Sequence, residues 1–175
     1  MIVRATPDVM DIYMKLFNHV EPLGVDESWG IYAEGNEVAI INNTLIRGRP
    51  RGSELNAIEY MRKPIVQFED EEIIRLRNSA GFFLLVSTPT CSICPLAIAI
   101  LHNVASMSKV KLVVLDYEDE LVKPIRGNVL ATPYIMYSPS IAPPQSLQEW
   151  GMGMPSPQAF LNTVMKQVLS NNLTQ

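Results

Sequence analysis

The most constraining feature of this chain is a pair of cysteines three positions apart, Cys91 and Cys94, between two strongly apolar segments. Residues 82–86 read Phe-Phe-Leu-Leu-Val, which is typical of a short strand buried on both faces of a sheet. Residues 96–107 are almost entirely apolar and long enough for a helix. The pattern therefore predicts a buried strand that leads through the cysteine pair into a buried helix.

The segments after this helix complete an α/β pattern. A second apolar strand is predicted over 111–117, and the order strand, helix, strand implies a right-handed crossover between two parallel strands. Residues 134–137 and 147–151 are then predicted as strands, and residues 157–170 as a closing helix. We expect residues 79–175 to form one α/β domain.

The first 78 residues have a different pattern. Helices are predicted over 7–20, 53–62 and 69–77, and a hairpin is predicted from two β-rich runs, 29–33 and 37–41, around a glycine turn. This part is expected to be a smaller α+β segment.

A weak internal repeat connects the two parts of the chain. Gly48-x-Pro50 precedes a helix containing Leu55, and Gly153-x-Pro155 precedes a helix containing Phe160, all at one constant offset. Each pair follows a predicted hairpin, so the order of elements agrees with the repeat.

The position of the cysteines favours dithiol chemistry. Unpaired N–H groups and the dipole at a helix N-terminus stabilise a thiolate, and they lower a cysteine pKa from about 8.5 to roughly 3.5–7.5. Cys91 is expected to be exposed and to attack a disulfide, whereas Cys94, inside the helix, is expected to be shielded and to resolve the mixed disulfide.

Three other interpretations of the cysteine pair are weaker: a structural disulfide, a zinc site and a redox-inert remnant. A structural disulfide closing so short a loop removes little entropy from the unfolded chain. A zinc site lacks a second CxxC, and the histidines are limited to His19 and His102, the latter too far along the helix from Cys94. A redox-inert remnant of a dithiol site remains open. No metal and no cofactor are expected.

A second element of the expected site is Thr132-Pro133, directly before the strand 134–137. In this context the proline is predicted to be cis and to face the dithiol, which leaves the Thr132 backbone free to pair with an extended substrate. The alternative is an ordinary turn proline.

Composition limits the partners and the location. The formal net charge is −4 and the pI is about 5.2, which argues against nucleic acid as a ligand. The longest apolar run, 93–101, is too short to cross a bilayer, and residues 1–8 lack the features of a signal peptide. We expect a cytoplasmic protein without membrane association.

The string from Thr88 to Ala97, Thr-Pro-Thr-Cys-Ser-Ile-Cys-Pro-Leu-Ala, resembles the second unit of the archaeal protein disulfide oxidoreductases, also called glutaredoxin-like proteins. The resemblance implies a thioredoxin-like, three-layer α/β fold with a mixed central sheet over residues 79–175, preceded by a half-thioredoxin-like segment, 1–78, without a CxxC. It also implies that Cys91 is the nucleophile and Cys94 the resolving thiol, with Thr90, Thr132 and Pro133 binding substrate.

Two departures from that family are visible. The first unit has no CxxC, and Leu85 occupies the position, six residues before Cys91, where thioredoxins keep an acidic residue. The usual proton acceptor for the resolving thiol is therefore absent from its expected position.

The sequence thus predicts a thiol–disulfide oxidoreductase that acts on protein dithiols and disulfides and is recycled by a reductase. The alternative is a non-catalytic interaction module with the same fold.

An isolated hairpin is marginal in water, and a helix apolar nearly all round needs cover on both sides. We therefore expect either that the N-terminal segment docks tightly on the C-terminal sheet or that the chain self-associates, with a homodimer favoured.

Overall fold

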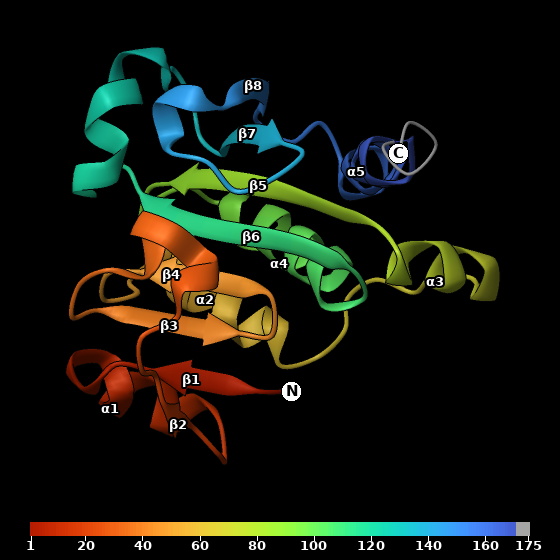
Figure 1. Ribbon diagram of the computed structural model, residues 1–175. Helices are drawn as coiled ribbons and strands as arrows, with labels where there is room; N and C mark the ends of the chain where they lie inside the picture. The colour runs from red at the N-terminus through yellow and green to blue at the C-terminus, as the bar shows by residue number, and fades with distance from the viewer. Residues whose placement is uncertain (171–175) are drawn as a thin grey trace.

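The computed structural model describes residues 1–170, in which eight strands form one mixed sheet with the order β2-β1-β3-β4-β6-β5-β7-β8 (Figure 1). The α/β fold class predicted from the sequence is confirmed. The strands are β1 (Val3–Ala5), β2 (Glu21–Pro22), β3 (Val38–Ile41), β4 (Thr44–Arg47), β5 (Ala80–Ser87), β6 (Lys109–Asp116), β7 (Tyr134–Ser138) and β8 (Gln148–Met152).

Helices of two kinds cover the two faces of this sheet. All the α-helices contribute side chains to the core on one face, and two of the three 3₁₀ helices contribute to a second core on the other, which gives three layers. The helices are α1 (Pro7–Leu16), α2 (Ser53–Met61), α3 (Asp70–Arg77), α4 (Cys94–Ser106) and α5 (Pro157–Ser170), with 3₁₀ helices η1 (Glu27–Ala33), η2 (Glu120–Asn128) and η3 (Pro144–Ser146).

The C-terminal part follows the sequence prediction closely. β5 and β6 are parallel neighbours joined by α4, and β7 and β8 extend the sheet in antiparallel orientation. Residues 82–86 of β5 are completely buried, because α4 covers one face of the strand and the 3₁₀ layer covers the other. The continuous apolar character of this run was therefore the correct signal.

The hairpin predicted around Gly35 is wrong. Residues 27–33 form the 3₁₀ helix η1, in which Gly30 has φ 56° and ψ −138°, and Trp29 and Tyr32 are buried in the second core. β3 instead pairs with β4 through a tight turn at Asn42, whose φ of 53° lies in the left-handed region that asparagine tolerates. Trp29 and Tyr32 lie three positions apart, so they do not follow the two-residue repeat of a half-buried strand.

The N-terminal segment also contains two short strands, β1 and β2, that the sequence pattern did not reveal. With them, the order β1-α1-β2-η1-β3-β4-α2 matches the later order β5-α4-β6-η2-β7-η3-β8-α5, apart from the added 3₁₀ helix η3. The strand arrangements match as well, since β2-β1-β3-β4 and β6-β5-β7-β8 have the same pairings. The segment is smaller than the C-terminal part, but it repeats the same sequence of elements in shortened form.

Two glycines of the predicted repeat occupy equivalent places. Gly48 follows β4 with φ 82°, and Gly153 follows β8 with φ 73°. The Gly48 N–H donates to the Glu37 carbonyl at 2.7 Å, and the Gly153 N–H donates to the Pro133 carbonyl at 2.8 Å, in each case directly before the neighbouring strand. The third match is not equivalent in burial, because Leu55 is 36% exposed and Phe160 is buried.

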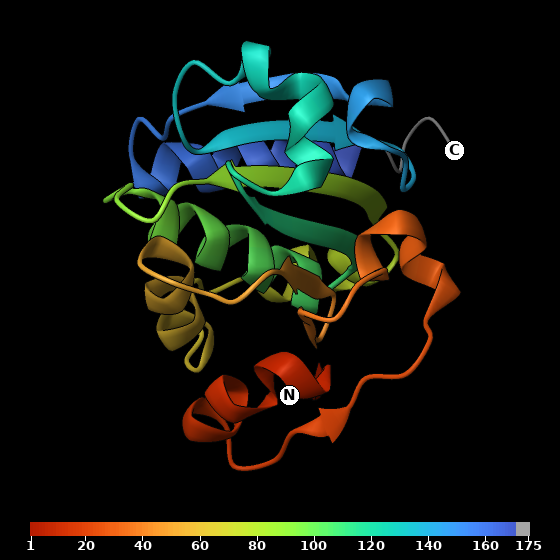
Figure 2. The same ribbon diagram turned by 90° about the vertical axis from the view of Figure 1, so that its left-hand side faces the viewer.

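The two parts share the sheet and the helical layer. β4 pairs in parallel with β6, which places Leu45 opposite Val113 and Ile46 opposite Val114. In the helical layer α2 lies beside α4 (Figure 2), so α4 has cover on both flanks from α2 and α5. The expectation that the N-terminal segment docks on the C-terminal sheet is confirmed. The proposed domain boundary at residue 78 lies in the short connection between α3 and β5, and strands from both sides of it belong to one continuous sheet. The division into two domains stays a prediction.

A buried histidine links α4 to the β3–β4 turn. His102 is 1% exposed, and its Nδ1 lies 2.8 Å from Thr44 Oγ1 while its Nε2 lies 3.3 Å from Ser106 Oγ. The Asn42 side-chain amide donates to the same Ser106 hydroxyl at 3.2 Å. Burial lowers the pKa of His102 to about 4, so the ring is neutral at physiological pH.

This histidine predicts a pH-dependent loss of stability on acidification. The unfolded chain binds a proton at His102 near pH 6.5 and the folded chain only near pH 4, so the stabilisation is complete above pH 6.5 and is lost as the pH falls toward 4. The stability advantage of the wild type over His102→Gln should shrink by about 2 kcal/mol between pH 7 and pH 5. Denaturant unfolding of both proteins at the two pH values measures it, and an unchanged difference would contradict the prediction.

Candidate redox site

Cys91 and Cys94 form a disulfide at the start of α4, with their Cα atoms 5.4 Å apart. Cys94 is the first residue of the helix and is 0% exposed, whereas Cys91, in the preceding turn, is partly exposed. Pro95 occupies the first turn of α4, where its missing N–H costs nothing. The predicted order of exposure of the two sulfur-bearing residues is confirmed.

The loop that carries Cys91 contacts the segment before β7. The Cys91 N–H donates to the Thr88 carbonyl at 3.2 Å, and the Thr88 and Thr132 hydroxyls lie 3.3 Å apart. The Thr132-Pro133 peptide bond is cis, as predicted from the sequence. Thr132 is partly exposed beside this loop, and Thr90 is exposed next to Cys91. The substrate-binding role of Thr90, Thr132 and Pro133 stays a prediction.

A carboxyl group missed by the sequence analysis lies at the end of β5, directly before this loop. Glu54, in the first turn of α2, is 3% exposed, and its Oε1 accepts a hydrogen bond from Ser87 Oγ at 3.3 Å. Burial is the main cause that raises the pKa of Glu54 to about 8, and the charge of Asp116 on the neighbouring strand acts in the same direction.

The position of Glu54 explains why it was missed. The expected acidic position is occupied by Leu85, on the same face of β5 as Ser87, and the carboxyl group comes instead from another element. An acidic residue in the first turn of a helix ordinarily indicates an exposed side chain that interacts with the helix dipole. No local pattern in the sequence distinguishes Glu54 from such residues.

Replacing this carboxyl group should stabilise the protein at alkaline pH. The folded chain keeps the Glu54 proton up to about pH 8, and the unfolded chain releases it near pH 4.5. The free energy by which proton binding at Glu54 favours the folded chain is therefore complete below pH 4.5 and is lost as the pH rises through 8. Glu54→Gln should therefore unfold with a larger free energy than the wild type at pH 9, by on the order of 2 kcal/mol, and with a similar one at pH 4.5. The exposed Glu59→Gln on the same helix is the control and should show no such difference.

Three arginines near this end of the sheet are each paired with a carboxylate. Arg47 contacts Asp119 at 3.2 Å, Arg49 contacts Asp11 at 2.8 Å, and Arg51 contacts Asp116 at 3.8 Å. The cleft of about 450 Å³ that they line also contains Glu37, Glu118 and Glu120. The carboxylates balance the charge of the arginines, which argues against a phosphate site here.

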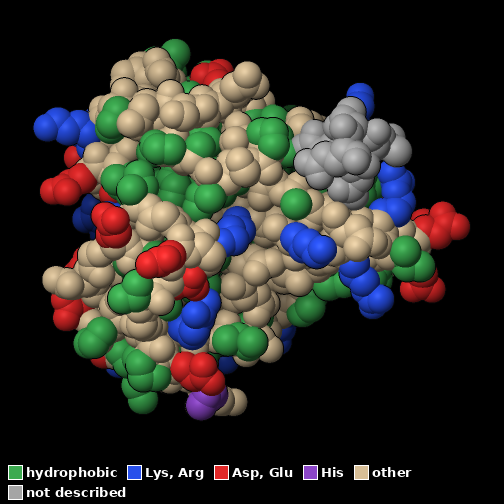
Figure 3. Space-filling view, in the orientation of Figure 1, with side chains coloured by type: hydrophobic (Ala, Val, Ile, Leu, Met, Phe, Trp, Pro, Cys, Tyr) green, Lys and Arg blue, Asp and Glu red, His purple; other side chains and the backbone are tan. Residues whose placement is uncertain are grey.

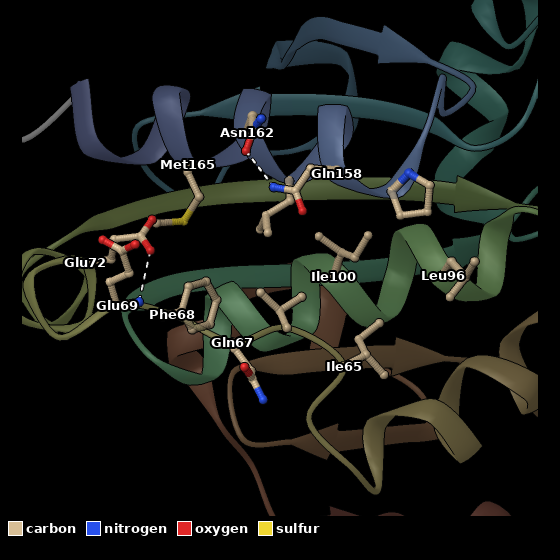
Figure 4. Close-up of a pocket in the computed structure, with 13 residues that line it drawn as sticks. Ile65, Gln67, Phe68, Glu69, Glu72, Leu96, Ile100, Gln158, Asn162 and Met165 are labelled. Carbon is tan, nitrogen blue, oxygen red and sulfur yellow. Dashed lines mark hydrogen bonds between the residues drawn. The ribbon is translucent and has the colours of Figure 1, made fainter.

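A cavity of about 710 Å³ lies between α4, α5 and the linker before α3 (Figure 4). Its lining is apolar along α4, at Leu96 and Ile100, and mixed along α5, where Leu161 and Met165 lie beside Gln158, whose amide donates to Asn162 at 2.9 Å. Leu96 lies in the first turn of α4, but neither cysteine, Thr132 nor Pro133 lines the cavity. The cavity is therefore separate from the redox site.

The surface and the remaining side chains add three observations. Acidic and basic side chains both occur on the face that Figure 3 shows. Within residues 1–170 no His, Cys, Asp and Glu side chains form a group able to hold a metal ion. In the same part of the chain, no helix has both the length and the apolar character needed to cross a bilayer.

The N-terminal segment has the same order of elements at this place but lacks the cysteine loop and the proline of the site. Its helix α1 begins with Thr6 as N-cap and Pro7 in the first turn, so the strand β1 enters the helix without an intervening cysteine loop. Glu37 occupies the position before β3 that Pro133 occupies before β7. Thr6 Oγ1 accepts from the Val38 N–H at 3.0 Å and donates to the Asn36 carbonyl, which closes this end of the segment.

Comparisons with known proteins agree with this fold. The chain is similar to the alkylhydroperoxide reductase AhpF from Enterococcus faecalis, with 12% identity and a TM-score of 0.68 over 95% of this chain and 88% of that one. It is also similar to a protein disulfide oxidoreductase from Aeropyrum pernix, with 16% identity and a TM-score of 0.64 over 96% of this chain and 85% of that one. No protein-family model and no curated protein matches the sequence. The resemblance to a thioredoxin-like fold is confirmed.

Proposed function

We propose that this protein is a thiol–disulfide oxidoreductase that exchanges disulfides with protein substrates through Cys91 and Cys94. The observation that carries the proposal is the disulfide at the N-terminus of α4, with a partly exposed first cysteine and a fully buried second one. A purely structural disulfide over so short a loop would add little stability. The difference in exposure matches the separate tasks of a nucleophile and a resolving thiol.

In the reduced protein the Cys91 thiolate attacks one sulfur of a client disulfide. The other client sulfur leaves as a thiolate and takes up a proton, and a mixed disulfide joins Cys91 to the client. Cys94 then loses its proton and attacks the Cys91 sulfur, which releases the second client sulfur as a thiolate. The client gains two electrons, the Cys91–Cys94 disulfide forms, and the reverse sequence would oxidise a client dithiol.

We assign the proton of Cys94 to Glu54 as a candidate partner, because Glu54 is a buried carboxyl group hydrogen-bonded to Ser87 at the end of β5, and its neighbour Ser53 contacts the Cys91 carbonyl. Burial raises the pKa of Glu54 to about 8, near the ordinary thiol value of about 8.5, so its deprotonated fraction can exchange a proton with a thiol at little cost in free energy.

The client is proposed to bind in extended form along Thr132 and Pro133, beside Thr90 and Cys91. The Thr88–Thr132 hydroxyl contact holds the cysteine loop and this segment together, so a client disulfide at Cys91 would lie next to the Thr132 backbone. Protein disulfides are favoured over glutathione as substrates, and a reductase would return the dithiol to its reduced form.

Location and assembly stay predictions from the sequence. The cytoplasmic location is untested. A homodimer was favoured because the apolar helix α4 and the strands near β3 each needed a neighbouring layer. Within one chain, α2 packs against α4, and the shared sheet includes β3. Sedimentation across a range of concentrations tests whether a homodimer still forms.

The experiment that tests the function is reduction of a protein disulfide by the reduced protein, combined with titration of its thiols. An oxidoreductase should turn over insulin disulfides and should contain a Cys91 thiol with a lowered pKa. A dithiol of ordinary pKa without turnover would favour the alternative, a non-catalytic interaction module with the same fold.

A further inference from the structure

The start of α2, which belongs to the N-terminal segment, contacts the backbone of the cysteine loop. Ser53, 2% exposed, donates its N–H to the Pro89 carbonyl at 3.0 Å. Its hydroxyl donates to the Cys91 carbonyl at 2.7 Å and lies 3.2 Å from the Pro89 carbonyl. One residue therefore holds two carbonyl groups of the loop, Pro89 through its backbone N–H and Cys91 through its hydroxyl.

The approach of the two loops is close enough to require glycine at position 52. Gly52 has φ +54°, in the left-handed region, and a Cβ there would lie 2.2 Å from the Pro89 carbonyl oxygen. Any side chain at this position would collide with the backbone of the cysteine loop and push it away. Gly52 thus permits the contact that Ser53 makes.

The contact also places a second helix N-terminus against the loop. The first N–H of α2, from Ser53, points to the Pro89 carbonyl, while α4 begins at Cys94 on the other side of Cys91. The N-terminus of α4 is the local source of positive potential for a Cys91 thiolate, so the benefit depends on where the Cys91 backbone is held.

We infer that Ser53, with the access provided by Gly52, is a positioning residue that sets the reactivity of Cys91 by fixing the backbone of its loop. The inference rests on the proposed function in taking Cys91 as the nucleophile. It assigns a task to the N-terminal segment: although this segment has no cysteine, it supplies part of the redox site of the C-terminal part.

Loss of the Ser53 hydroxyl leaves the Cys91 carbonyl without its donor, and the loop is free to move the thiol away from the helix N-terminus. The pKa of Cys91 should then rise by about one unit, which leaves about tenfold less thiolate at neutral pH. Ser53→Ala does not change the charged groups of this region, Arg51, Glu54 and Asp116, so a shift would report the position of the loop.

The experiment titrates Cys91 in the full-length reduced protein, with Cys94→Ser in every sample so that one thiol is observed. The ultraviolet absorbance of the thiolate gives the pKa, and the alkylation rate at neutral pH gives the reactivity. Ser53→Ala is compared with Ser53→Thr, which keeps the hydroxyl. The matched control is Ser108→Ala at the opposite end of α4, where the hydroxyl donates to the Val104 carbonyl at 2.7 Å.

The expected result is about tenfold slower alkylation for Ser53→Ala, recovery toward the wild-type rate for Ser53→Thr, and no change for Ser108→Ala. Thermal unfolding of all variants shows whether the two alanine variants lose comparable stability. An unchanged Cys91 pKa in Ser53→Ala, or an equal shift in Ser108→Ala, would overturn the inference.

The titration uses no client, so it separates this inference from the proposed function. A shift in Ser53→Ala together with no turnover by the wild type would leave the positioning role standing and remove the catalytic one. Turnover by the wild type with an unchanged Cys91 pKa in Ser53→Ala would support the catalytic role and remove the positioning role.

Discussion

Cys94→Ser is expected to accumulate covalent adducts with client proteins, and Cys91→Ser is expected to form none. Cys91 is the partly exposed sulfur, so it makes the first bond to a client, and only Cys94 can then displace the client. Each substitution should lower the turnover of a protein disulfide by about 10³-fold or more, because each removes an obligatory bond-forming step. Non-reducing electrophoresis with mass spectrometry identifies the adducts.

The reduced wild type provides the companion measurement. Its two thiols should differ in their rate of alkylation at neutral pH, with Cys91 reacting first, because Cys94 is buried and is the less accessible thiol. Equal rates for the two thiols, or adducts trapped by Cys91→Ser, would contradict the assignment of nucleophile and resolving thiol.

Removing the N-terminal segment is expected to prevent folding of the rest. A fragment of residues 79–175 would lack β4, which exposes the edge of β6 at Leu112, Val113 and Val114. It would also lack α2, whose buried side chains Ala57, Ile58 and Met61 pack in the same core as α4. A domain has only about 5–15 kcal/mol of net stability, and the free energy lost with both contacts should exceed this amount. Soluble yield and cooperative thermal unfolding measure the effect.

A longer fragment that begins at Thr44 is the matched control. It keeps β4 beside β6 and α2 beside α4 while losing β1, α1, β2, η1 and β3, so it should retain cooperative unfolding. A fragment of residues 79–175 that unfolds cooperatively and keeps the Cys91–Cys94 dithiol would contradict this prediction. That result would support the division into two domains at residue 78.

The C-terminal elements were predictable because their signals are local and strong. The short apolar run 82–86 is typical of a doubly buried strand. The apolar helix after the cysteines required cover on both flanks, which α2 and α5 provide. The cysteine pair and Thr132-Pro133 were also identified, since each depends on a short motif at the end of a predicted element.

The remaining features depend on contacts between distant parts of the chain. β1 and β2 contain only three and two residues, so no periodic pattern could reveal them. The turn at Asn42 and Asn43 contains typical turn residues, but the aromatic run of 29–33 was the stronger signal for a strand. Ser53 contacts the cysteine loop, and Glu54 contacts Ser87 at the end of β5, only because α2 packs beside α4, which no local pattern indicates.

The two edges of the sheet differ in whether another strand could be added. β2, at one end, contains only Glu21 and Pro22, both exposed, and proline has no N–H to offer a further strand. β8, at the other end, has five residues and no proline. A sheet that can be extended at one edge can join a second copy in a closed two-fold pair, but it cannot continue into an open filament. The short, proline-terminated β2 therefore limits assembly through strand pairing to two molecules.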